Sequence, residues 1–365
     1  MRLKKTFYSG IIPGLILLAL LIGCGGGGSS DSSSTASVSK SFAYVTNMDS
    51  NTVSVYSINN TTGALTAINT AAAGTQPGSI AVEPFNKYAY VSNYGSNNVS
   101  AYSIDAGTGA LTAIGTFPAG TNPGSLTIHP SGKYVYVANF GSYDVSAYSI
   151  NASTGALIAI GTFPAGTWPT SVVVAPSGRY AYVSNQGGAG EVLSYSINTA
   201  TGELTGPIDN DVAGSGPLSV TVHPSGKFAY VANGWSNDVS VFTIDTVTGL
   251  LTAIRNISAG TRPNTVKVAP NGKYIYVTND QSQDISAYSI TSKTGTLTAI
   301  GSFGTGPGTG PMFVTVDRTG KYVYTANYNT SNVSAFSINA ATGALTEIGT
   351  VAAGKSPSSI MTSSW

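Results

Sequence analysis

A four-residue pattern that ends in asparagine recurs seven times along the chain and constrains the fold more than any other feature. Each copy has an aromatic residue, a β-branched residue, a small residue and then the asparagine. The asparagines are separated by 46 or 48 residues and are Asn47, Asn93, Asn139, Asn185, Asn233, Asn279 and Asn327. A repeat of this length holds one small sheet, and such units stack on their neighbours instead of forming one irregular core. The spacing therefore predicts a closed ring of seven like modules.

The second repeat shows what one module contains. Residues 79–82, 88–93, 99–104 and 111–117 are short runs of strand-favouring residues, with turn residues between them. No segment has a convincing helical period. Four antiparallel strands joined by tight turns form one blade of a β-propeller. We therefore predict an all-β fold, a seven-bladed β-propeller of four-stranded antiparallel blades.

The two ends of the repeat region complement each other. The region opens at Phe42 with a second strand, while residues 357–362 form an inner strand that has no blade of its own. Pairing the last strand with the first blade would remove an exposed sheet edge. We expect residues 41–365 to form the propeller, with the ring closed by the C-terminal strand.

The repeat pattern resembles that of a known family. Residues 44–47, 90–93, 136–139 and 276–279 read Tyr-Val-(Thr/Ser/Ala)-Asn, and Thr-Gly-x-Leu follows further on. This resembles the YVTN repeat of seven-bladed propellers of the lactonase-like family, which includes 6-phosphogluconolactonases and many surface proteins with no known reaction. The resemblance extends from about Phe42 to the C-terminus and implies the propeller fold.

The N-terminus indicates export. Residues 1–24 have a basic start, an apolar run and a Leu-Ile-Gly-Cys end, which resembles the lipobox of bacterial lipoproteins. Cys24 is then the lipidation site. Residues 25–40 are mostly Gly, Ser, Thr and Ala, so we expect a flexible tether. These features predict an exported lipoprotein, anchored by lipid in the outer membrane or at the cell surface.

Charge and motifs exclude several classes of ligand. Removing the three basic residues before Cys24 leaves 13 of the 16 Lys and Arg against 15 Asp and Glu, so no case for nucleic-acid binding remains. The sequence has no Cys/His cluster, HExxH or Walker motif. We therefore predict no metal and no cofactor.

Ligand-binding candidates come from positions that vary between repeats on one face. The crossings between blades and the loops between second and third strands lie together around the channel mouth. The variable aromatic residues on these loops are Trp168, Tyr94, Phe140, Tyr328 and Trp235. Exposed aromatic side chains suit a carbohydrate or a partner protein. The same positions include Arg262, the best candidate for binding an anion.

Catalytic residues are not identified by the sequence. Lactone hydrolysis needs a base and a donor for the oxyanion. Only Arg262, Asp280 and Glu191 are scattered candidates, and no family catalytic motif fixes them. The two histidines, His129 and His223, fall in equivalent turns on the opposite face, where we expect a structural role.

The sequence favours an envelope-anchored binding module that recognises an unknown protein or carbohydrate with its aromatic face. The first alternative, implied by the resemblance, is a hydrolase of sugar lactones such as 6-phosphogluconolactone. The second alternative is a structural surface protein that packs with its own copies.

Overall fold

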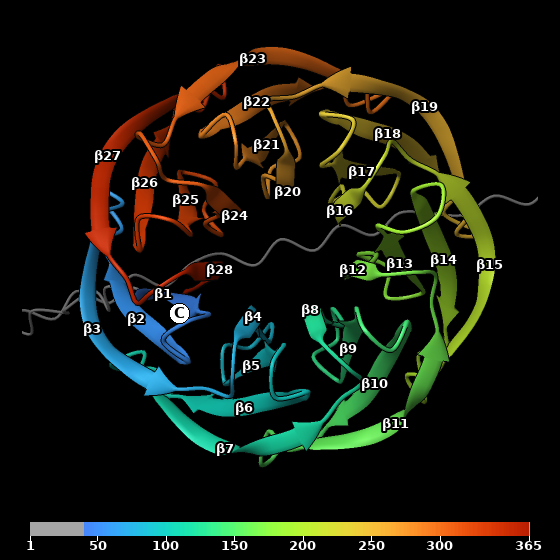
Figure 1. Ribbon diagram of the computed structural model, residues 1–365, viewed down its shortest axis with the longest axis horizontal. Coiled ribbons are helices and arrows are strands. Elements are labelled where there is room, and N and C mark those ends of the chain that lie inside the picture. Colours follow the sequence, from blue (N-terminus) through green and yellow to red (C-terminus); the bar gives the residue numbers. More distant parts are fainter. Residues whose placement is uncertain (1–39, 365) are drawn as a thin grey trace, which may run out of the picture. The chain divides into compact units, whose positions relative to one another are not determined.

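The computed structural model describes residues 40–364, and these residues form a seven-bladed β-propeller. Within this range, 28 strands form seven four-stranded antiparallel sheets, arranged as blades around a central channel (Figure 1). The predicted fold class is confirmed. The predicted signal peptide, the lipidation site Cys24 and the tether before Lys40 lie outside the described residues. Residues 40–364 contain no helix that is both long and apolar enough to cross a membrane.

Each blade contributes one strand to each of four concentric layers. The inner strands are β4 (Pro77–Val82), β8 (Pro123–Ile128), β12 (Pro169–Val174), β16 (Pro217–Val222), β20 (Pro263–Val268), β24 (Pro311–Val316) and β28 (Pro357–Ser364). The second strands are β1 (Ser41–Asn47), β5 (Tyr88–Asn93), β9 (Tyr134–Asn139), β13 (Tyr180–Asn185), β17 (Phe228–Asn233), β21 (Tyr274–Asn279) and β25 (Tyr322–Asn327). The third strands are β2 (Thr52–Ile58), β6 (Asn98–Ile104), β10 (Asp144–Ile150), β14 (Glu191–Ile197), β18 (Asp238–Ile244), β22 (Asp284–Ile290) and β26 (Asn332–Ile338). The outer strands are β3 (Leu65–Ala72), β7 (Leu111–Pro118), β11 (Leu157–Pro164), β15 (Leu204–Val212), β19 (Leu251–Ser258), β23 (Leu297–Gly304) and β27 (Leu345–Ala352).

We number the blades 1 to 7 by their second strands, from β1 to β25. The face that carries the crossings between blades and the loops between second and third strands is called the top face. The opposite face, with the turns between first and second strands, is the bottom face. Every inner strand begins at the top with a proline, so the seven crossings lead into the inner strands in the same way.

Blade 1 is completed by the other end of the described chain. β1 pairs with β28 in an antiparallel register that runs from Ser41 opposite Ser364 to Asn47 opposite Pro357. Figure 1 shows β28 (red) beside β1 (blue), with β28 on the side of the central channel. The predicted closure by the C-terminal strand is therefore confirmed, and every blade has four strands.

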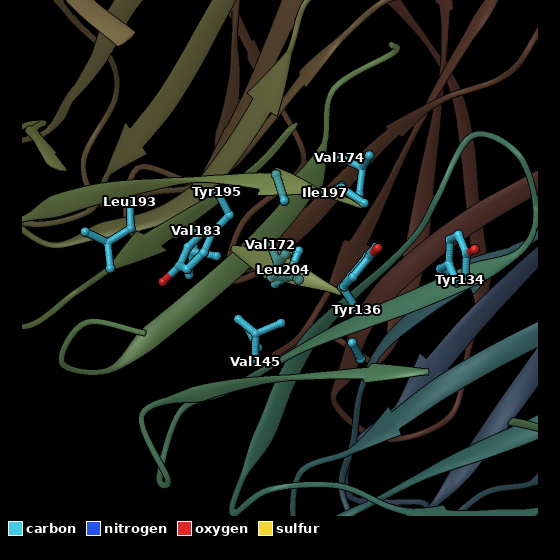
Figure 2. Close-up of a cluster of buried hydrophobic side chains, with 13 residues drawn as sticks. Tyr134, Tyr136, Val145, Val172, Val174, Val183, Leu193, Tyr195, Ile197 and Leu204 are labelled. Carbon is cyan, nitrogen blue, oxygen red and sulfur yellow. The ribbon is translucent and has the colours of Figure 1, made fainter. Parts of the chain in front are cut away.

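Apolar side chains fill the spaces between neighbouring blades. Figure 2 shows one such cluster between blades 3 and 4, where Tyr136 and Val145 of blade 3 lie near Val172 and Val183 of blade 4. All four side chains are buried. Seven clusters of this type occur within residues 40–364, which matches a ring of like modules that each bury their faces against both neighbours.

Hydrogen bonds from buried tyrosines also join neighbouring blades. The hydroxyl of Tyr90 in blade 2 donates to the carbonyl oxygen of Gly155 in blade 3 at 2.9 Å, and five other blades repeat this contact. In blade 7, Tyr324 donates to Gly63 of blade 1 at 2.9 Å, so the same bond spans the closure. A bond of this type contributes about 1 kcal/mol.

The asparagines that mark the repeat are structural. Asn93 donates from Nδ2 to Ser100 Oγ at 2.9 Å and to Asn98 Oδ1 at 2.7 Å, and its Oδ1 accepts from the backbone N–H of Gly74 at 3.1 Å. All seven asparagines are fully buried. They fix the top loops from below, and variable residues of those loops remain available at the surface.

Candidate functional site

The central channel is hollow at two levels. A cavity of about 180 Å³ lies at the top, where Met48, Tyr94 and Asn264 are among the lining residues. A second cavity of about 330 Å³ lies deeper, against the middle and lower parts of the inner strands. Serine and threonine side chains and apolar residues line most of both. We call these the upper cavity and the lower cavity.

An arginine and an aspartate form an ion pair on the top face of blade 6. Arg262 lies on the crossing that precedes β20, and Asp280 directly follows β21. Arg262 Nε lies 3.4 Å from Asp280 Oδ2. The backbone reinforces this arrangement, because the N–H of Asp280 donates to the carbonyl oxygen of Arg262 at 3.1 Å. The arginine side chain is 50% exposed and the aspartate side chain 12% exposed, so solvent reaches the pair mainly from the arginine side.

The surroundings of Asp280 favour its protonated form more than water does. Burial raises the pKa of the Asp280 carboxyl, while Arg262, the amide of Asn264 and the backbone N–H of Gln281 act in the opposite direction. The Oδ1 atom is buried and has no hydrogen-bond partner among the described residues. An incompletely satisfied carboxylate with a raised pKa is a typical property of a functional site.

Asn264 connects this pair to the channel. It lies one residue after the proline that begins β20, and it lines the upper cavity. Its Nδ2 contacts Met312 Sδ of blade 7 at 3.2 Å. Arg262 and Asp280 do not line the upper cavity themselves, but the amide of Asn264 acts on the Asp280 carboxyl. Asn264 therefore lies between the cavity and the acid–arginine pair.

The second acidic candidate lies elsewhere. Glu191 begins β14 in blade 4, two blades away from Asp280 in blade 6. Of the three candidate catalytic residues, the structure thus brings Arg262 and Asp280 together, whereas Glu191 lies apart from them.

Three of the five aromatic candidates lie together across blades 2, 3 and 4. The rings of Phe140 and Trp168 are nearly parallel, at 12°, with centroids 6.0 Å apart. The rings of Tyr94 and Phe140 are tilted by 46°, with centroids 6.4 Å apart. Tyr143, which the sequence analysis did not single out, joins them because Trp168 Nε1 donates to its hydroxyl at 3.2 Å. We call these four residues the aromatic ridge.

The other two aromatic candidates lie on different blades. Trp235 is in the loop after β17 in blade 5, where its ring covers Gly216 and the side chain is 58% exposed. Tyr328 follows β25 in blade 7 and is half-buried. Within residues 40–364, neither ring makes a ring–ring contact with the ridge.

The lower cavity holds two cations that the sequence analysis also missed. Lys267 on β20 forms no hydrogen bond or ion pair with another residue in the described range, and burial lowers the pKa of its ammonium. Arg318 donates from Nη1 to the carbonyl oxygen of Pro84 at 3.4 Å. Burial lowers the pKa of Arg318, whereas the carboxylate of Glu83 opposes this change.

The histidines have the structural role expected for them. His129 Nε2 lies 2.9 Å from the carbonyl oxygen of Gly178, and Nδ1 lies 2.7 Å from Ser131 Oγ. His223 repeats both contacts with Gly272 and Ser225. Both histidines are buried in bottom-face turns. Within residues 40–364, no three side chains of His, Cys, Asp or Glu gather to form a site that could hold a metal ion.

Alignment of the repeats contains the signal for the missed residues. Tyr143 occupies a position where Asn51, Asn97 and Asn237 stand in other blades. Lys267 occupies an inner-strand position that holds Thr127 in blade 3. Lys267 differs from the threonine that both neighbouring repeats have at its position, and Tyr143 is the one aromatic residue at a position that otherwise has asparagine, glutamine, serine or glycine.

The closed ring of 28 strands with a top-face acid–arginine pair defines the class as a seven-bladed β-propeller with a candidate ligand site at its channel mouth. The chain belongs to the family described as Lactonase, 7-bladed beta-propeller, whose model matches residues 34–167, 158–268 and 255–362. Among curated proteins, none matches the sequence.

Solved structures with the same fold include several bacterial proteins. A candidate 6-phosphogluconolactonase from Bacteroides fragilis is 24% identical, with a TM-score of 0.80 over 90% of this chain and 99% of that chain. A candidate 6-phosphogluconolactonase from Bacteroides uniformis is 22% identical, with a TM-score of 0.81 over 89% and 99%. A periplasmic gluconolactonase from Pseudomonas aeruginosa is 20% identical, with a TM-score of 0.78 over 89% and 99%.

Proposed function

We propose that this protein hydrolyses the ester bond of sugar-acid lactones on its top face, with Arg262 and Asp280 as the catalytic residues. The observation that carries the proposal is this pair, a largely buried carboxylate with a raised pKa held 3.4 Å from an exposed guanidinium. The match to the lactonase family supports this activity better than the binding module that the sequence favoured. The similarity to structures of gluconolactonase type supports the choice of substrate class.

The proposed reaction uses one residue as base and the other to stabilise charge. The carboxylate of Asp280 removes a proton from a water molecule, and the water oxygen attacks the lactone carbonyl carbon. The guanidinium of Arg262 donates to the carbonyl oxygen while negative charge develops there. The ring C–O bond then breaks, the proton passes from Asp280 to the departing ring oxygen, and the product is a hydroxy acid.

The geometry of the pair suits both roles. Arg262 contacts Asp280 through Nε, and within residues 40–364 its two Nη atoms form no hydrogen bond, so they are available to a substrate oxygen. The raised pKa makes Asp280 a stronger base than an exposed aspartate. The upper cavity next to Asn264 provides room for part of the sugar.

The test compares four forms of the purified protein on glucono-1,5-lactone and on 6-phosphogluconolactone. We expect turnover above the spontaneous rate for at least one lactone. Asp280→Asn should lower kcat by about 10²- to 10⁴-fold, because the base is lost. Arg262→Ala should lower kcat by about 10²- to 10³-fold, because a donor to the oxyanion is lost.

The matched control is Lys355→Ala. Lys355 is an exposed cation on a top-face crossing, one position earlier in its repeat than Arg262. It should retain full activity if the effect of Arg262 is specific. Correctly folded protein that hydrolyses neither lactone, or an Asp280→Asn variant with full activity, would disprove the proposal. The signal peptide predicted for residues 1–24 would place this activity outside the cytoplasm, and that location is part of the proposal.

A further inference from the structure

Two top-face positions have left-handed backbone in every blade, and the residues there include glycine, glutamine, serine and arginine as well as asparagine. One is the residue before the proline that begins each inner strand, such as Asn122, and the other is the residue just before the third strand, such as Asn97. Asparagine is among the few residues that adopt this conformation readily. In blade 2, Asn97 Oδ1 accepts from the backbone N–H of Asn122 at 2.8 Å, so the amide also caps the crossing. Blades 1 and 5 use Asn51 and Asn237 in the same way.

Blade 3 departs from this arrangement at both positions. Tyr143 has φ of 61° and Trp168 has φ of 55°, where blade 2 has two asparagines. Bulky residues in this region are strained by about 1–3 kcal/mol each. The capping bond is lost as well, since the backbone N–H of Trp168 has no acceptor within residues 40–364. Local stability alone does not account for these two residues.

The strained residues instead build an exposed aromatic surface. The indole of Trp168 donates to the hydroxyl of Tyr143, and its ring lies parallel to that of Phe140. Trp168 is 38% exposed and Tyr143 is 45% exposed. The half-buried Phe140 and Tyr94 continue the aromatic ridge inward, because Tyr94 lines the upper cavity. The ridge thus extends from exposed loops of blade 3 to the mouth of the channel.

The size and charge of the ridge indicate what it can bind. Aromatic side chains of 150–250 Å² at these exposed fractions present on the order of 200 Å² on Trp168 and Tyr143. A stable protein interface needs about 800 Å² from each partner. The four side chains of the ridge are uncharged, so the ridge has no ionic group of its own with which to bind a charged ligand. The indole N–H of Trp168 donates to the oxygen of the Tyr143 hydroxyl, so the O–H of Tyr143 can donate to a ligand. Flat apolar rings with this hydroxyl at their edge suit a sugar ring, which has apolar C–H faces and hydroxyls at its rim.

We propose that the aromatic ridge is a binding site for a neutral pyranose, such as one unit of a polysaccharide. The site is separate from the Arg262–Asp280 pair in blade 6 and does not depend on the proposed hydrolysis. It accounts for the strain in blade 3, because residues placed for binding lower stability and are retained for function.

The test exchanges the blade 3 residues for those of blade 2. The double variant Tyr143→Asn and Trp168→Asn recreates the pair formed by Asn97 and Asn122. Binding of maltohexaose, cellohexaose and chitohexaose is measured separately by calorimetry for the wild type and the variant, and thermal midpoints are recorded. Phe85→Ala, which removes an exposed aromatic residue from the bottom face, is the control.

The proposal predicts opposite changes in affinity and stability. At least one sugar should bind the wild type and the Phe85→Ala variant equally well, and should bind the double variant at least tenfold more weakly. The thermal midpoint of the double variant should stay unchanged or rise. Failure of all three sugars to bind the wild type, equal binding to the double variant, or a lower midpoint for that variant would overturn the proposal.

Discussion

The turn between the third and outer strands of each blade offers a quantitative test of how neighbouring blades fit. Gly155 in blade 3 has φ of +72°, and a methyl group placed on it would lie 2.4 Å from Cδ1 of Tyr88 in blade 2. The tyrosine cannot move away freely, because its hydroxyl donates to the carbonyl oxygen of Ala152 in the same turn at 3.3 Å. Gly155→Ala therefore combines backbone strain with a steric clash between blades.

Two other glycines separate these effects. Gly226 has φ of +71° with no atom within 4 Å of an added methyl group, and Gly124 has neither a left-handed φ nor a close neighbour. Gly226→Ala should lower the free energy of unfolding by about 1–2 kcal/mol through strain alone. Gly155→Ala should lower it by about 2–5 kcal/mol, since overpacking adds about 1–3 kcal/mol. Gly124→Ala should be neutral or stabilising by up to about 1 kcal/mol, because alanine restricts the unfolded chain.

Urea unfolding followed by circular dichroism measures the three variants against the wild type. The reasoning requires midpoints in the order Gly124→Ala, Gly226→Ala and then Gly155→Ala, from highest to lowest. Equal midpoints for the last two would show that the blade contact is unimportant. Equal midpoints for all three would refute the argument from backbone strain too.

Two further predictions concern charged groups. Because Arg262 lowers the pKa of Asp280, Arg262→Gln should move the acid limb of the pH–rate profile of the proposed lactone hydrolysis to higher pH. An unchanged limb, or one moved to lower pH, would contradict the assignment of Asp280 as base. Burial lowers the pKa of Lys267 in the folded protein below 10.5, its value in the unfolded chain. Between these two pKa values the unfolded chain binds more protons than the folded one. The stability of the wild type should therefore rise with pH over that interval. Lys267→Met, which copies Met361 at the same position of β28, should be more stable than the wild type at pH 7, and this advantage should shrink as the pH approaches 10.5. Chemical denaturation at several pH values measures it, and a constant difference would show that Lys267 does not titrate in this range.

The fold could be predicted from the sequence because each repeat has the same local pattern of strand-favouring residues and turn residues. The strand expected at residues 79–82 is observed as Pro77–Val82, and the others of that blade agree equally well. Turn glycines, continuous runs of buried strand residues and the unpaired final strand all act locally or through exact repetition. One blade therefore specifies the remaining six.

The candidate site was predicted only in part, because it is formed by contacts between residues that differ from the repeat pattern. Arg262 and Asp280 could be selected as variable residues, but their pairing follows from a backbone hydrogen bond between crossing and loop. Trp168 and Phe140 were selected too, whereas Tyr143 was missed because its position reads as an ordinary turn. The left-handed backbone that makes a tyrosine unusual there is not visible in the sequence.

The pairing of β28 with β1 has a consequence for how the ring forms and opens. Within residues 40–364, these two strands join segments separated by about the whole length of the propeller, whereas the other sheets form from consecutive strands. Contacts of such high sequence separation form late, because the entropy of closing the loop is lost before they contribute any stability. Blade 1 is therefore a seam in an otherwise uniform structure. Spontaneous opening of the ring should begin at this seam. Separation of β28 from β1 would leave six complete blades and a first blade of three strands.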